Sequence, residues 1–254
     1  MITSKDNEKL KLVRRLADRK HREREGLFVT EGEDLLAAGR AAGREPELLL
    51  TAAGAGLGGD EVERALLDSA SALGSGSRAI AAWQQPWATE PSPLCVYLNG
   101  VRDPGNVGAI VRAADALGAR SVGLDPDTAD PFSPKAVRAS MGSVFAVDLV
   151  RCQVAATPAP RAGMVAHGGA WPPAGGPATL CLGAEREGLS GEAAAACDEL
   201  LTIPLAGAAE SLGVAAAAAI AIERVHEVSD SVAKPGSPPW QGKIGSAARE
   251  GGTS

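Results

Sequence analysis

One segment of the sequence places a cation one helical turn after a glycine, at the mouth of a strand-to-helix turn. Residues 99–115 read NGVRDPGNVGAIVRAAD, which predicts a strand end, a tight turn at residues 103–105 and a helix that Asn106 can cap. Gly108 and Arg112 then lie opposite the apolar stripe of this helix. A glycine there lets a backbone or a ligand approach beside a fixed cation. An ordinary surface arginine explains the same pattern equally well.

Two later segments are also rich in glycine, and each follows a strand-like run. Residues 180–190 read LCLGAEREGLS, which places Glu185 in a turn and Ser190 where it can cap the next helix. Residues 203–214 read IPLAGAAESLGV, which places Ser211 just ahead of an alanine-rich helix. Taken singly, both segments are explained by chain turning and by close packing of backbone.

The N-terminal stretch carries most of the positive charge. Residues 1–24 hold nine basic and four acidic residues, a local charge of +5 in a chain whose net charge is -6. A helix predicted over Asp6–Arg24 would place its basic side chains along one face at spacings of four, four and three. We interpret this stripe as a phosphate-binding surface, with a solvated helix face as the alternative. Its members are Lys11, Arg15, Arg19 and Arg22.

Strand-like and helical runs alternate along the chain, which predicts an α/β fold. A compact α/β unit precedes a linker at Pro86–Pro93, and within it Thr30 and Glu33 have the spacing of a capping box. Beyond the linker the alternation predicts a mostly parallel sheet flanked by helices. We expect a surface loop at residues 155–177 and a disordered tail after about Val228. The predicted strands of the second sheet are 94–98, 121–124, 164–166, 179–182 and 200–203.

The cysteine and histidine spacing indicates neither a metal site nor a disulfide framework. The four cysteines form no CxxC pair and the three histidines stand far apart, so we predict no metal ligands. The longest apolar run, Val214–Ile222, is far shorter than a bilayer-spanning helix, and the N-terminus is too charged for a signal peptide. We expect a cytoplasmic protein with no membrane partner.

Taken in order, the three glycine-rich segments resemble the three motifs of the SpoU/TrmH family of RNA ribose 2′-O-methyltransferases. The resemblance extends over about residues 1–228, because Thr30–Glu33 resembles the family's L30e-like N-terminal domain and Pro131–Ser143 its Ser-Pro-Lys helix, with Pro134 in the first turn. The matching positions in the three motifs are Asn99, Asp103, Pro104, Asn106, Gly108 and Arg112; Gly183, Glu185, Gly188 and Leu189; and Ile203, Pro204, Ser211, Leu212 and Val214.

The resemblance implies a SPOUT fold, in which the mostly parallel sheet is flanked by helices and tied into a trefoil knot. Residues 1–87 would be the small L30e-like α/β domain that binds RNA, residues 88–228 the methyltransferase domain and residues 229–254 the tail. S-adenosyl-L-methionine would be the cofactor, and a homodimer would form through the SPOUT domain. The substrate would be structured RNA, 23S rRNA by family analogy, with tRNA as the alternative.

The resemblance also implies roles for individual residues. Because a guanidinium stays protonated, we expect Arg112 to stabilise a developing alkoxide or clamp a phosphate rather than to act as a base. Asn106 would orient the substrate or Arg112, and Glu185 would hold the cofactor loop or Arg112. The remaining roles are catalysis for Ser211; cofactor binding for Leu182, Gly183, Ile203, Leu205 and Leu212; and RNA binding for Lys11, Arg15, Arg19, Arg22, Lys135 and Arg138.

One position departs from the family pattern. Where the third motif normally reads Ser-Leu-Asn, this chain reads Ser211-Leu212-Gly213. Glycine cannot donate the asparagine's side-chain hydrogen bonds, so a catalytically weakened RNA-binding relative is an alternative function. A dinucleotide-dependent oxidoreductase is disfavoured, because no G-x-G-x-x-G opens a helix after the first strand.

Overall fold

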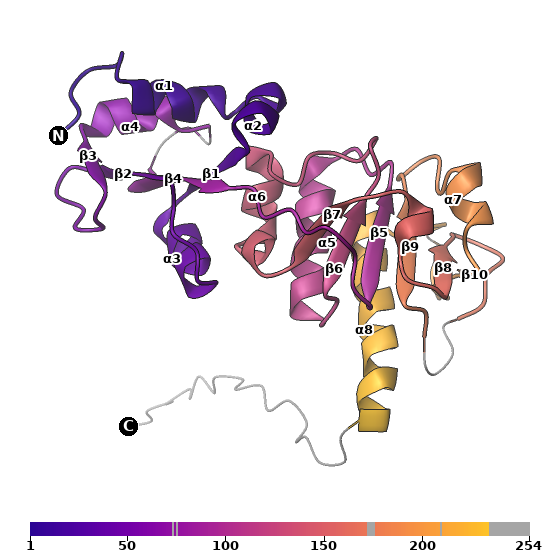
Figure 1. Cartoon of the computed structure of the whole chain (residues 1–254). Helices are drawn as coiled ribbons and strands as arrows, with labels where there is room; N and C mark the ends of the chain where they lie inside the picture. Colours follow the sequence, from indigo (N-terminus) through magenta and orange to yellow (C-terminus); the bar gives the residue numbers. More distant parts are fainter. Residues whose placement is uncertain (73, 75, 172–175, 209, 234–254) are drawn as a thin grey trace, which may run out of the picture.

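The chain forms two α/β units, each built on its own sheet (Figure 1). The computed structural model describes residues 1–72, 74, 76–171, 176–208 and 210–233. The N-terminal unit, residues 1–84, has a four-stranded sheet of order β1-β4-β2-β3, in which only β2 and β3 pair in parallel. Its elements are α1 (Glu8–Arg15), α2 (Arg19–Glu25), β1 (Leu27–Glu31), α3 (Glu33–Ala41), β2 (Leu48–Ala52), β3 (Asp60–Val62), α4 (Arg64–Ala70) and β4 (Ala79–Gln84).

Both faces of the N-terminal sheet are buried. Side chains alternate between the faces along each strand, so neighbouring residues of β4 pack into different hydrophobic clusters. On β4, Ile80 and Ala82 pack with Leu10 of α1 and Leu67 of α4. Trp83 points the other way, into a cluster that joins α3 to the second unit. Figure 1 shows α1 and α4 on one side of the sheet and α3 on the other. One hydrophobic core therefore runs through both units.

The C-terminal unit, residues 95–233, contains a six-stranded sheet of order β10-β8-β9-β5-β6-β7, and every strand pair in it is parallel. The predicted α/β fold with a mostly parallel sheet is confirmed. Helix α8 packs against α5 and β9, and α6 contacts β1 of the first unit. The elements are β5 (Cys95–Asn99), α5 (Pro104–Ala116), β6 (Ser121–Leu124), α6 (Pro134–Ser140), η1 (Ser143–Phe145), β7 (Asp148–Arg151), η2 (Val154–Ala156), β8 (Arg161–Met164), β9 (Thr179–Gly183), α7 (Gly191–Ala195), β10 (Glu199–Leu201) and α8 (Val214–Ala233).

The segment between the units extends the sheet instead of hanging free as a linker. Trp87 forms a parallel bridge with Leu149 of the edge strand β7, and the Ala88 amide donates to the Leu149 carbonyl at 2.9 Å. The Trp87 ring lies edge-on to Phe132, with 4.9 Å between ring centroids. The connection is therefore ordered by backbone pairing and by aromatic packing.

Several local predictions are wrong at element ends. Asp103, not Asn106, caps α5: its carboxylate accepts from the Gly105 amide, and Pro104 occupies the first turn. Strand β8 lies inside the predicted 155–177 loop and ends at Met164, and β7 was not predicted. Helix α8 continues past the predicted end at Val228, and residues 234–254 of the predicted tail lie outside the described residues.

The capping-box prediction for Thr30 is also wrong, whereas the cap predicted at Ser190 is confirmed. Gly32 precedes α3, and the Thr30 hydroxyl instead accepts a hydrogen bond from the Trp83 indole at 2.8 Å. Ser190 caps α7 by accepting from the Ala193 amide. Thr30 lies in a strand inside the core, where its hydroxyl meets the buried indole N–H of Trp83. The spacing of residues in the sequence cannot show such a contact.

The basic N-terminal stretch folds as two helices, not as the single helix predicted over Asp6–Arg24. The chain turns at residues 16–18 between α1 and α2. The Arg22 Nη1 group donates to the carbonyls of Leu16 and Ala17 at 2.8 and 2.6 Å, so this side chain satisfies the end of α1. Helical spacing could not reveal that Arg22, six residues after Leu16, folds back onto the end of α1.

Arg22 also forms a buried ion pair between the two units. Its Nη2 lies 2.8 Å from Oδ2 of Asp130, and the two side chains are 3% and 5% exposed. The other carboxylate oxygen of Asp130 accepts from the Phe132 amide at 2.9 Å. The prediction that Arg22 binds RNA is wrong, because its guanidinium is buried and bonded within the protein.

Replacing Arg22 with leucine is expected to lower the free energy of unfolding by about 3–5 kcal/mol, since it leaves the Asp130 carboxylate buried without a counter-charge. Adding Asp130→Asn to that variant should restore part of the loss, and Arg24→Leu, which removes an exposed pair, should unfold as the wild type does. Urea unfolding of the wild type, the double variant and the single variants Arg22→Leu, Asp130→Asn and Arg24→Leu gives the comparison. Additive losses from Arg22→Leu and Asp130→Asn would contradict a coupled pair.

Candidate active site

The strand order of the C-terminal sheet reverses at β5, with β6 and β7 on one side and β9, β8 and β10 on the other. In open parallel sheets, ligands bind outside the carboxyl ends of the strands at such a reversal. The segments that follow β5 and β9 leave the sheet side by side there, because Asn99 pairs with Gly183 at the strand ends. These are the first two glycine-rich segments of the sequence.

Side-chain hydrogen bonds join the two segments. Asn106 Nδ2 donates to Glu185 Oε1 at 2.6 Å, which unites two residues predicted to be catalytic. Asn99 Oδ1 accepts from the Ser190 amide at 2.7 Å, and Asn99 Nδ2 donates to Asp125 at 2.7 Å. Sequence reasoning missed Asp125, whose one available signal was its place just after a predicted strand.

The loop after β9 closes on itself. Ala184 and Gly188 form an antiparallel bridge, with Gly188 at φ 70°. A Cβ atom on Gly183 would lie 2.0 Å from the Gly188 carbonyl carbon and 2.2 Å from the Leu189 nitrogen. Glycine at position 183 therefore permits the return of the loop. Leu182, which precedes it, is a core residue that contributes backbone to this edge.

Arg112 is an exposed cation on α5. Within the described part of the chain, its guanidinium has no hydrogen bond or ion pair to another residue. Glu185 holds Asn106 rather than Arg112. Gly108 faces α6, where an added Cβ would lie 2.2 Å from the Ala136 carbonyl oxygen. The glycine thus serves helix packing, and Arg112 remains free for a ligand.

The third glycine-rich segment follows β10 and leads into α8. No described backbone N–H from Ile203 to Ala208 donates a hydrogen bond within the described chain, although Ile203 and Leu205 are half-buried. The amides of Ala206, Gly207 and Ala208 are exposed, so they are accessible to a ligand as well as to water. Leu212 is 37% exposed, and Ser211 is exposed with no hydrogen bond to the other predicted catalytic residues among the described ones.

The remaining residues of the predicted basic stripe are accessible, but two of them are paired. Lys11 lies 2.9 Å from Glu8, and Arg19 lies 2.9 Å from Glu23. Arg15 is exposed at the end of α1. Because α1 and α2 are separate helices, these cations do not follow one helical face as predicted.

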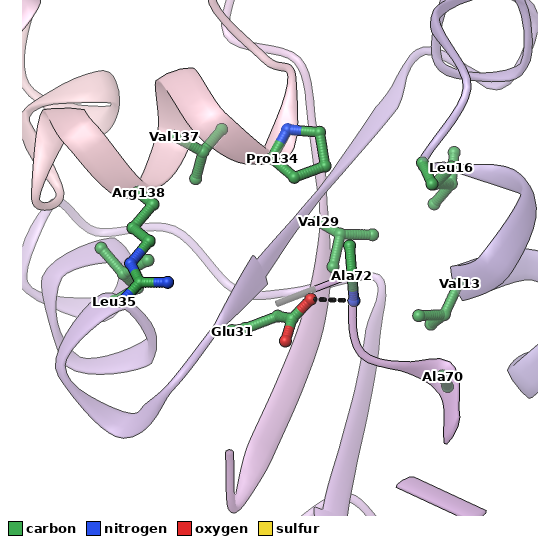
Figure 2. Close-up of a pocket in the computed structure, with 11 residues that line it drawn as sticks. Val13, Leu16, Val29, Glu31, Leu35, Ala70, Ala72, Pro134, Val137 and Arg138 are labelled. Atoms are coloured by element: carbon green, nitrogen blue, oxygen red, sulfur yellow. Dashed lines mark hydrogen bonds between the residues drawn. The ribbon is translucent and has the colours of Figure 1, made fainter. Parts of the chain in front are cut away.

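Lys135 and Arg138 of α6 lie in different surroundings. The Lys135 ammonium is 2.7 Å from Asp103, and with the Gly105 amide it holds the pKa of that carboxyl below its usual range. Arg138 lies beside Leu35 at a pocket on the seam between the units (Figure 2). This pocket has a volume of about 20 Å³, which is room for about one water molecule and too little for a ligand.

The cysteines are free and carry no site. Burial raises the pKa of Cys95, Cys181 and Cys197, and that of Cys152 to about 11, so these thiols stay protonated at neutral pH. Over the residues with described positions, no group of three His, Cys, Asp or Glu side chains could hold a metal ion. None of the described helices is long and apolar enough to cross a membrane.

Comparison with protein families defines the class of this fold and site. Residues 93–223 match the SpoU rRNA Methylase family, and residues 7–78 match the MRM3-like substrate binding domain. The chain therefore belongs to the SpoU rRNA methylase family. The AdoMet-bound rRNA methyltransferase of Sinorhizobium meliloti is 30% identical in sequence, with a TM-score of 0.77 over 89% of this chain and 97% of that one.

Two further matches, one to a solved structure and one to a curated sequence, come from Streptomyces viridochromogenes. The structure of the SpoU methyltransferase AviRb in complex with AdoMet is 25% identical, with a TM-score of 0.75 over 90% of this chain and 100% of that chain. The 23S rRNA (uridine(2479)-2'-O)-methyltransferase is 38% identical over 151 residues, which are 53% of each chain. The present chain spans about half the length of the curated relatives that it matches.

Gly183→Ala is expected to lower the free energy of unfolding by about 1–3 kcal/mol, because the new Cβ overlaps backbone that cannot move without opening the loop. Gly191→Ala is the matched control, since a Cβ there meets no atom within 4 Å. Urea unfolding compares the two variants. Equal stability of the two variants would show that the loop after β9 can move enough to accept a Cβ at position 183.

Proposed function

We propose that the protein transfers a methyl group from S-adenosylmethionine to a ribose 2′-hydroxyl of structured RNA, and that the RNA is 23S rRNA. The observation that carries this proposal is the Asn106–Glu185 hydrogen bond, which joins the first two motifs at the strand-order reversal. The family of the chain and the 23S rRNA named for its relative in Streptomyces viridochromogenes support the choice of reaction and substrate.

The residues at the carboxyl edge suit the adenosine part of the cofactor. Adenosine is recognised by shape and by hydrogen bonds rather than by charge, and the backbone from Ile203 to Ala208 offers free donors beside half-buried apolar side chains. Leu182, Gly183 and Leu212 complete the set that we assign to binding. When bound, the cofactor supplies an electrophilic methyl group on a sulfonium.

Arg112 is assigned the electrostatic part of the reaction. Negative charge would gather on the ribose oxygen as its proton leaves to solvent, and that charge would be used when the oxygen takes the methyl group and the sulfonium sulfur keeps the electron pair of the broken carbon–sulfur bond. The unpaired Arg112 cation stabilises that charge or clamps a neighbouring phosphate. Asn106, held by Glu185, orients the nucleotide, and Ser211 contributes from the third motif. Positioning is most of the task, because the methyl group needs no further activation.

Three wider features belong to the same proposal. Residues 1–87 bind RNA through Lys11, Arg15 and Arg19, together with Lys135 and Arg138 of α6, and residues 88–228 catalyse. The C-terminal chain forms the trefoil knot implied by the family resemblance, and two copies form a homodimer through this part. Exposed Ile220 on α8 supplies apolar surface for that interface. The protein works in the cytoplasm, where rRNA is modified.

Incubation with labelled S-adenosylmethionine and separate pools of 23S rRNA, 16S rRNA and tRNA tests activity and substrate together. We expect label in 23S rRNA, at a nucleotide that mapping identifies as 2′-O-methylated. Label in tRNA alone would mean that the substrate is tRNA and not 23S rRNA. Label in no RNA, with RNA binding retained, would favour the non-catalytic alternative that Gly213 raises.

Arg112→Ala should lower the rate of methyl transfer by at least about 100-fold, the usual effect of losing a group that stabilises charge in the transition state. Cofactor binding, measured by calorimetry, should stay near the wild-type value, because Arg112 is not in the set that holds adenosine. Arg120→Ala removes another exposed arginine of the same unit and serves as the control. Wild-type turnover in Arg112→Ala would remove this residue from the mechanism.

Gly213→Asn should raise the rate of methyl transfer roughly 2–10-fold, the value of about one regained hydrogen bond. The site can accept the side chain, since a Cβ on Gly213 meets no atom within 4 Å. The Gly213 carbonyl accepts from the Ala217 amide, so asparagine would also sit at a favourable N-cap of α8. Gly213→Ala controls for the added Cβ. Equal rates in both variants would mean that the amide has no role in this chain.

A further inference from the structure

A groove opens between α2 of the N-terminal unit and the carboxyl ends of β6 and β7. It has a volume of about 390 Å³. Arg19, Trp87, Arg151 and Gln153 contribute its larger polar and aromatic side chains, and Leu124, Pro126 and Pro131 are among the residues that line the rest. Among the residues that line this groove, the sequence predicts a role for Arg19 alone, namely RNA binding.

Trp87 and Arg151 form a stack at the groove. The Arg151 guanidinium carbon lies 4.3 Å from the centroid of the Trp87 ring, and the Arg151 side chain is 50% exposed. The indole is held in place, since its N–H donates to Gln85 Oε1 at 2.8 Å and Phe132 packs edge-on against it. A guanidinium plane fixed over an indole presents a flat cationic surface on which another planar group can stack.

The two acidic residues of the groove wall are occupied. Asp125 accepts four hydrogen bonds, from the amides of Gly100 and Thr128, the Thr128 hydroxyl and Asn99. Asp130 is neutralised by its buried pair with Arg22. The cations at the rim, Arg19 and Arg151, are the accessible charges of this groove.

One carboxylate bridges those cations. Glu23 of α2 lies 2.9 Å from Arg19 and 3.3 Å from Arg151, and these arginines lower its pKa, Arg19 most of all. All three side chains are 40% exposed or more. Exposed ion pairs of this kind are weak, so an incoming phosphate can take the place of the carboxylate.

Hydrogen bonds along the carboxyl edge of the sheet link the groove to the candidate active site. Asp125, in its wall, is bonded to Asn99, and Asn99 holds Ser190 at the end of the loop after β9. An RNA strand that enters the active site along the carboxyl edge of the sheet therefore passes the groove.

We propose that this groove is a nucleotide-binding subsite for the RNA substrate, in which a base stacks on the Arg151 guanidinium over Trp87 and a phosphate replaces Glu23 between Arg19 and Arg151. The ligand is an unpaired nucleotide next to the methylated one, because only an unstacked base can present its face to a guanidinium. This inference rests on the proposed function for the identity of the RNA, and it assigns a second contact point beyond the reacting ribose.

Binding of in vitro transcribed 23S rRNA and of a labelled single-stranded uridine oligomer to the full chain, without S-adenosylmethionine, tests the subsite. Arg151→Ala should weaken binding of both probes about tenfold or more. It should also reduce the slope of log affinity against log salt by about one. Arg151→Lys keeps the charge and loses the plane, so it should keep the wild-type salt slope while losing most of the affinity.

The variant Glu23→Gln is expected to have the opposite effect on the affinity for both probes. Freed from their shared carboxylate, Arg19 and Arg151 should bind both probes several-fold more tightly and with a steeper salt dependence. Arg120→Ala, which removes an arginine just before β6, at the amino edge of the same sheet, is the control and should leave affinity unchanged. Urea unfolding of each variant tests whether the fold is preserved.

Wild-type affinity in Arg151→Ala, or weaker binding in Glu23→Gln, would overturn the subsite. Loss of affinity in Arg151→Ala that is matched by its loss of stability, with no change in Glu23→Gln, would reduce the stack to a contact between the units and overturn it too. The proposed function fails separately, when the wild type methylates none of the RNA pools, because the subsite is judged by binding alone.

Discussion

The ion pair between Arg22 and Asp130 fixes how the two units lie against each other, and the groove between them depends on that arrangement. Its charges are almost fully removed from water, so each side chain needs the other to offset its desolvation. Arg22 reaches Asp130 only when α2 lies against the C-terminal sheet, and at the same time it satisfies the end of α1. The relative position of the units is thereby specified, together with the width of the groove that lies between α2 and β7.

Parallel strand pairing supplies the second constraint. Because all six strands of the C-terminal sheet run the same way, the segments that follow them collect at one edge. The reversal of strand order at β5 then makes residues from distant parts of the sequence neighbours. Asn106 and Glu185 come within 2.6 Å in this way, and Asn99 serves both neighbouring loops. The site is a consequence of topology rather than of any single motif.

The shared core limits how far the two units can act independently. Trp83 and Phe28 of the N-terminal sheet pack with Phe145 of the C-terminal unit, and Phe28 also stacks near Phe132. Such burial favours a rigid junction between the units, because a hinge motion would expose these rings to water and raise the free energy. The first unit therefore lies at a set distance and angle from the carboxyl edge of the C-terminal sheet.

Sequence patterns were enough to predict the class of fold, most strands of the parallel sheet and the motifs that place Arg112, Asn106 and Glu185 in one family pattern. Those features follow from local periodicity and from residue type at fixed spacing. Tertiary structure alone decided that Arg22 is buried rather than bound to RNA. It also decided that Glu185 holds Asn106, and that Asp103 caps α5. Each of these depends on a partner distant in sequence or on competing acceptors nearby, and a linear pattern carries no information about which polar group forms the hydrogen bond.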